Sequence, residues 1–204
     1  MSQPTLFNAG QSANTLDNRG ASKIPVGIHS KVTISSVELG ENYLDINFVK
    51  TFEDGQNRVH NDRIWTPDKS RFQDNPNAGK TAEQVFVEAC QNRVECITQY
   101  LKLVCTQEEL GKITGATYDA FLKAAFPVLN SRLGGVLVNL KLIPKKGYSS
   151  IPNFPIYVEA YVEGNEPTLF YSKWEADQVS AMGNPPKNNN SVIDNSQKEQ
   201  GPLF

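Results

Sequence analysis

The chain has little of what most catalytic and metal sites are built from. Of its 204 residues, two are histidines, His29 and His60, and three are cysteines, Cys90, Cys96 and Cys105. The cysteines lack the paired spacing of metal ligands, so core packing accounts for them. A glycine-rich phosphate loop, a zinc-protease helix motif and a nucleophile elbow are also missing. We therefore expect neither an enzyme nor a bound cofactor or metal.

Long apolar runs are missing too. No apolar stretch approaches the ~20 residues that a membrane-spanning helix needs. The first residues, MSQPTLFNAG, lack the basic and then apolar order of a secretion signal. An odd number of cysteines without such a signal favours reduced thiols. We expect a cytoplasmic protein that does not cross a membrane.

Charge is nearly balanced over the whole chain, at −2, but it is unevenly placed. Between Ala120 and Val158 there is no acidic residue. Five cations fall in that stretch: Lys123, Arg132, Lys141, Lys145 and Lys146. A local excess of positive charge is typical of a site for a polyanion such as nucleic acid. An ordinary solvated face explains it equally well at this stage.

The chain divides into a folded centre and two polar ends. Residues 1–23 are rich in Asn, Ser, Gly and Gln and are expected to form a flexible arm. Residues 24–180 carry the periodic segments of one domain. Residues 181–204 are expected to be a disordered tail, which closes on the apolar tip Pro202, Leu203 and Phe204.

Periodicity predicts two groups of strands around a helical block. Alternating apolar residues indicate strands near residues 28–34, 43–48 and 58–65, with Asp54-Gly55 as a hairpin turn. Residues 81–131 are predicted to be helical, with capping boxes at Thr81 and Thr106 and a kink or end near Pro127. The long helix carries an apolar stripe that starts at Val87. After Gly134 the period of two returns over residues 136–144, 155–162 and 168–174, with a loop at 145–154.

This order predicts a mainly β fold with inserted helices, of the α+β class. The simplest arrangement is a five- to six-stranded antiparallel barrel of the oligonucleotide-binding (OB) type, interrupted by the helical block at about 81–131. An α+β sheet with its helices on one face is the alternative.

Single-stranded nucleic acid needs aromatic side chains for stacking and cations for phosphates. Two stretches, RIWTPDKSRF and KKGYSSIPNF, contain both. The candidate nucleic-acid-binding residues are Tyr43, Lys50, Arg58, Arg63, Trp65, Lys69, Arg71, Lys145, Lys146 and Tyr148.

The layout resembles the single-stranded DNA-binding proteins of tailed bacteriophages. The resemblance rests on IPVGIHSKVTISSVELGENYLDINF leading into RIW, then helices, then GVLVNLKLIPKKGYSSIPNFPIYVEAY, and it covers about residues 24–180. It implies an OB-type barrel that coats single-stranded DNA with little sequence preference and without a cofactor. It also implies a role in phage replication or recombination in the host cytoplasm.

The same resemblance implies that the tip docks partner replication or recombination proteins. In that family the chain tends to end in an acidic tail with a terminal Phe. Pro202, Leu203 and Phe204 match the terminal Phe of that pattern. This tail departs from the pattern, because it has only two acids, Asp194 and Glu199, balanced by Lys187 and Lys198.

Two other functions stay open on the sequence. One is a protein–protein interaction or virion assembly module that ignores nucleic acid. The other is RNA binding on the same fold, since stacking and phosphate contacts do not by themselves distinguish RNA from DNA.

Overall fold

The computed structural model describes residues 22–145, 148–152 and 156–181. The strands are β1 (Gly27–Leu39), β2 (Tyr43–Thr51), β3 (Asn57–Trp65), β4 (Leu137–Lys145), β5 (Tyr148–Ser150) and β6 (Val158–Ala160). The helices are α2 (Ala82–Leu101), α3 (Gln107–Lys112), α4 (Tyr118–Arg132) and α5 (Lys173–Ala181). Two 3-10 turns, η1 (Lys69–Arg71) and η2 (Pro76–Ala78), lie between β3 and α2.

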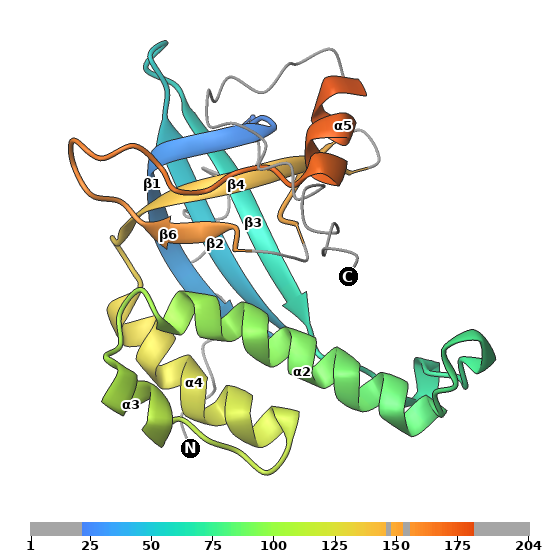
Figure 1. Ribbon diagram of the computed structural model, residues 1–204. Coiled ribbons are helices and arrows are strands. Elements are labelled where there is room, and N and C mark those ends of the chain that lie inside the picture. The colour runs from blue at the N-terminus through green and yellow to red at the C-terminus, as the bar shows by residue number, and fades with distance from the viewer. Residues whose placement is uncertain (1–21, 146–147, 153–155, 182–204) are drawn as a thin grey trace, which may run out of the picture.

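The strands form one curled antiparallel sheet in the order β3-β2-β1-β4-β5, with β6 also paired to β4. The helices α2, α3 and α4 lie between β3 and β4 in the chain and gather at one end of the sheet (Figure 1). The result is an OB-like half-barrel with inserted helices, which confirms the predicted fold class. The path ends at two edge strands, β3 and β5.

Strand periodicity places the core on the inner face of the sheet. In β2 the side chains of Leu44, Ile46 and Phe48 are fully buried, as their alternation predicted. The β2–β3 hairpin turns at Asp54-Gly55, where Gly55 adopts the left-handed φ of 74° that the turn requires.

Helix α2 closes one end of the barrel with its C-terminal half. Its capping box is formed by Thr81 and Gln84, as predicted. Ile97 and Tyr100 are buried in the core. The N-terminal half extends past the edge of the sheet (Figure 1). The predicted stripe is therefore wrong at its start, because Val87 lies on this projecting half and is 44% exposed.

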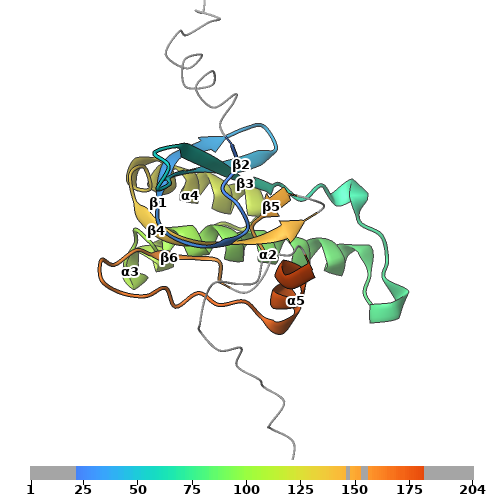
Figure 2. The ribbon, with the colours of Figure 1, turned by 90° about the horizontal axis from the view of Figure 1, so that it is seen from above.

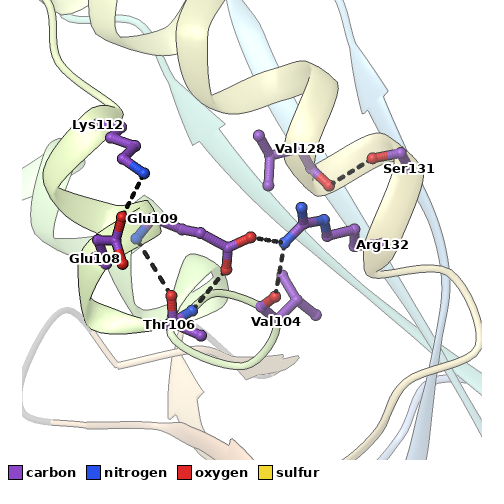
Figure 3. A network of polar contacts seen from close by, with 8 residues as sticks. All are labelled: Val104, Thr106, Glu108, Glu109, Lys112, Val128, Ser131 and Arg132. Atoms are coloured by element: carbon purple, nitrogen blue, oxygen red, sulfur yellow. Dashed lines mark hydrogen bonds and ion pairs between the residues drawn. The ribbon is translucent and has the colours of Figure 1, made fainter.

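Side-chain contacts tie α3 to the end of α4 (Figure 3). Glu109 accepts the N–H of Thr106 at 2.8 Å and completes the predicted capping box. Its other oxygen accepts a 2.9 Å bond from Arg132, which also donates to the carbonyl of Val104. Helix α4 runs through Pro127 to Arg132, so of the two predicted alternatives, a kink or an end at Pro127, the end is wrong. Burial of Leu129 beyond the proline keeps the last turns packed.

Two predictions about the C-terminal part are wrong. The strand predicted at 168–174 does not form: residues 168–172 pair with no strand in the described structure, although Leu169 and Tyr171 are buried in alternation, and residues 173–174 begin α5. Alternating apolar residues indicate burial, but a strand also needs the free edge of another strand to pair with. The edges of β4 are already paired with β1, β5 and β6. The segment predicted as a loop at 145–154 instead contains β5.

The predicted flexible arm at 1–23 ends earlier than expected. Val59 donates its N–H to the carbonyl of Ser22 and accepts the N–H of Ile24, both at 3.0 Å. Residues 22 and 23 are therefore attached to β3. The rest of the arm, and the tail after Ala181, lie outside the described residues.

Candidate nucleic-acid interface

A groove of about 430 Å³ lies between the two edge strands, β3 and β5. Figure 2 shows these strands next to each other, with α2 beneath them. The lining comes from four places in the chain: Lys23, residues 60–65 of β3, Arg93 and Cys96 of α2, and Lys145, Tyr148–Pro152 and Tyr157.

The groove follows the edge of β3 instead of either face. Successive side chains of a strand point to opposite faces, yet every residue from His60 to Trp65 lines the groove. The bonds of Val59 to Ser22 and Ile24 show which backbone groups point outward at this edge. By the same alternation, the backbone groups of Asn61, Arg63 and Trp65 face the groove.

Two aromatic side chains stand exposed on the two sides of the groove. Trp65 on β3 is 52% exposed and Tyr148 on β5 is 55% exposed. Trp65 is held in place by its neighbours. Its ring contacts Tyr43 edge-on at 5.4 Å between centroids. The guanidinium of Arg63 lies over both rings, at 4.1 Å from Tyr43 and 5.4 Å from Trp65.

Arg63 is therefore a positioning residue more than a free cation. Its Nε and Nη2 donate to the two carboxylate oxygens of Asp45 at 2.8 and 2.6 Å. A bidentate pair of this kind fixes the plane of the guanidinium. Tyr43, predicted to be open to a ligand, is half-buried beneath it.

Three other cations of the groove have no carboxylate partner. Within the described part of the chain, Lys23, Arg93 and Lys145 form no ion pair. They come from three separate segments and meet around one groove. Because a cation outside an ion pair has no carboxylate to give up when it binds a phosphate, these three are the strongest candidates for phosphate contacts.

The other predicted cations are placed differently. Lys69 and Arg71 follow Trp65 but pair with Glu83 and Asp68. Lys50 and Arg58 face each other at the far end of the β2–β3 hairpin. They do not line the groove: Lys50 donates to the Ser30 carbonyl, and Arg58 pairs with Asp54.

The acid-free stretch does not form the basic patch predicted from it. Arg132 pairs with Glu109, and Lys141 is buried against Glu175. Lys123 is exposed on α4, away from the groove lining. Only Lys145 reaches the groove, and Lys146 lies outside the described residues. The acids that neutralise the stretch come from elsewhere in the chain.

Sequence reasoning missed Lys23 and Arg93. Lys23 was assigned to the flexible arm. Arg93 lies in the middle of α2, a helix that was interpreted only through its apolar stripe. No local pattern marks either residue, because each reaches the groove only through the packing of its segment against β3.

One carboxylate, Asp62, lies among these cations. Its Oδ2 accepts a 2.6 Å bond from the Tyr100 hydroxyl. Burial raises the pKa of Asp62 from 3.8 to about 6, and the negative charge of Asp45 raises it further. Tyr100, Arg93 and Tyr157 oppose this rise, because they favour the charged form. Burial also lowers the pKa of His60 to about 4, so this histidine is neutral at pH 7.

The raised pKa of Asp62 predicts a pH dependence of stability. The folded state binds this proton more tightly than the unfolded chain, so the free energy of unfolding should fall as pH rises from about 4 through about 6. Asp62→Asn should remove this fall and be the more stable form at pH 7, by up to ~3 kcal/mol. Urea unfolding of both proteins between pH 4 and 7 measures this. A difference between them that does not vary with pH would contradict it.

The described residues contain no group of three or more His, Cys, Asp or Glu able to hold a metal ion. Over the same residues no helix is long and apolar enough to span a membrane. The proposed docking tip at Pro202, Leu203 and Phe204 lies outside the described residues.

Comparisons with protein-family models, with curated proteins and with solved structures gave no match to this chain.

Proposed function

We propose that this protein binds single-stranded DNA in the groove between β3 and β5, without catalysing a reaction. Bases stack on Trp65 and Tyr148, while Lys23, Arg93 and Lys145 neutralise phosphates. Binding of this kind tolerates most sequences, because every base offers a face for stacking. The resemblance to phage proteins supports a role in coating DNA during replication or recombination.

One observation carries the proposal: two exposed aromatics meet three cations around one groove, and none of these cations has an ion pair with another described residue. The net charge of the chain is −2, so a general attraction for polyanions does not explain this clustering. Most other cations with a described contact are already paired with carboxylates. The OB-like half-barrel adds support, since such barrels bind oligonucleotides beside their strands and loops.

The test is a salt series of binding to a fluorescent dT oligonucleotide. We expect Kd to rise steeply with salt, because phosphate contacts release counterions. Lys145→Ala and Arg93→Ala should each weaken binding severalfold and reduce the slope of log Kd against log salt by roughly 0.7. Lys123→Ala is the matched control, since this exposed lysine also lacks a carboxylate partner in the described structure but does not line the groove.

The outcomes separate this proposal from its rivals. Absence of any salt-sensitive complex would refute it and favour a protein-interaction or virion assembly module. Tighter binding of the matching ribo-oligonucleotide would assign the groove to RNA. Equal losses in Lys123→Ala and Lys145→Ala would show that the groove is not the DNA-binding site.

We further propose that Pro202, Leu203 and Phe204 dock a partner protein of replication or recombination. Support comes from an apolar pair, Leu203 and Phe204, in a stretch that is otherwise polar, and from the resemblance to phage proteins. A chain lacking these three residues should bind DNA normally and lose only the partner.

A further inference from the structure

A carboxylate such as Asp62 is not expected in a groove that binds only phosphates. It lines the groove beside Arg63, and no cation pairs with it within the described residues. By contrast, Asp45 on the same strand pair is fully engaged by Arg63. A phosphate next to the Asp62 carboxylate would be repelled. The part of a nucleotide that suits this position is therefore a base with N–H donors.

Keeping a carboxylate here has a cost that packing alone does not explain. Tyr100 needs a hydrogen-bond acceptor, and an asparagine would supply one without a buried charge. Burial disfavours the charged form of Asp62, as its raised pKa shows. Residues whose pKa is shifted by burial occur often at binding sites.

Asp62 retains free acceptor positions. A carboxylate has about four lone-pair sites on two oxygens; Tyr100 uses one of them, on Oδ2, and the Tyr157 hydroxyl also lies near the carboxylate. Acceptor positions therefore remain for further donors, and Asp62 keeps some exposure at the groove that it lines. Two parallel N–H donors would fit them in the bidentate arrangement that arginine makes with carboxylates elsewhere.

Among the DNA bases, guanine alone places two N–H donors side by side on its pairing edge, N1–H and the N2 amino group. Thymine offers one donor there, and adenine and cytosine offer one amino group each. The guanine O6 acceptor adjoins N1, and the outward backbone N–H groups of Asn61 and Arg63 lie on either side of Asp62 along the strand edge.

We infer that Asp62 gives the groove a preference for guanine, by accepting both donors of its pairing edge while the neighbouring base stacks on Trp65. This inference rests on the proposed single-stranded DNA binding and refines it. The preference adds to stacking that tolerates any base, so the protein still coats mixed sequences. Single strands allow the contact because the pairing edge is free.

The test compares three short oligonucleotides: all dT, dT with one central dG, and dT with one central deoxyinosine. Inosine keeps guanine's shape and N1–H but lacks the N2 amino group. We expect wild-type protein to bind the dG oligonucleotide about fivefold or more tightly than all-dT, with inosine between them. Asp62→Ala and Asp62→Asn should lose the dG preference and bind the three oligonucleotides alike, at least as tightly as wild type binds all-dT, because both variants lack the carboxylate that repels phosphate. Circular dichroism establishes that each variant is folded.

The result separates the two proposals. If wild type binds all three oligonucleotides equally, the preference is refuted while DNA binding stands. If both variants keep the dG preference, another residue reads the base and the assignment to Asp62 fails. If none of the oligonucleotides binds, the proposed function fails, and this inference with it.

Discussion

Trp65→Ala should weaken binding of a dT oligonucleotide roughly tenfold to a hundredfold, because stacking on one aromatic contributes ~1–3 kcal/mol. Trp65 is exposed beside the groove, and Tyr43 and Arg63 fix its ring before any ligand arrives. A ring that is already ordered loses little side-chain entropy on binding. Fluorescence anisotropy at low salt measures the change.

The second tryptophan supplies a matched control. Trp174, in the first turn of α5, is 62% exposed but does not line the groove. Trp174→Ala should leave Kd within about twofold of wild type. Intrinsic fluorescence gives an independent reading, since the chain has two tryptophans: Trp174→Phe should keep the quenching by DNA and Trp65→Phe should lose it. Quenching that persists in Trp65→Phe would place the base elsewhere.

Glu175→Ala should reduce the free energy of unfolding by about 3–5 kcal/mol, because it leaves a buried lysine without its counterion. Lys141 and Glu175 are 0% and 1% exposed, and Nζ lies 3.1 Å from Oε2. Lys141 also donates to the Phe170 carbonyl, and Glu175 accepts the N–H of Ser172. The pair thus attaches α5 to β4. Urea unfolding measures the loss.

A double replacement separates the cost of an unpaired charge from the value of the pair. Lys141→Met with Glu175→Leu removes both charges and keeps apolar volume, so its stability should lie close to wild type. Asp177→Ala, an exposed acid in the same helix, is the control for α5 itself. A Glu175→Ala protein within 1 kcal/mol of wild type would show that water or a local shift solvates Lys141.

The two sites show how differently charge can be used in one chain. Between α5 and β4, the buried Lys141 and Glu175 pair with each other and serve the fold. In the groove, three cations and Asp62 are without ion pairs among the described residues. Asp62 is desolvated by burial, and a desolvated charge outside an ion pair costs stability, so its position beside three cations at one open groove supports a binding role.

Local patterns determined most of the fold. Alternation located β1, β2 and β3, Asp54-Gly55 marked the hairpin, and both capping boxes formed where Thr81 and Thr106 predicted them. These signals succeed because they depend on neighbours within a few residues along the chain. The same patterns failed at residues 168–172, where strand formation depended on whether a distant edge was free.

The site was predicted in part. Trp65, Tyr148 and Lys145 were chosen from aromatic and basic composition, and the structure brings all three to one groove. Lys69, Arg71, Lys50 and Arg58 looked equivalent in sequence, yet each is engaged by a contact elsewhere. Composition identifies a cation but cannot say whether an acid from another segment neutralises it.

The sequence by itself determined the first three strands, the helical block, the return to strands at β4 and an OB-like arrangement, because periodicity and turn chemistry are local. Only the tertiary structure decided which charges remain unpaired, since the partners of Arg132 and Lys141 lie 23 and 34 residues away in the chain. It also decided that Lys23, Asp62 and Arg93 share a groove with Trp65, because that groove exists only where the sheet curls and brings its two edge strands together.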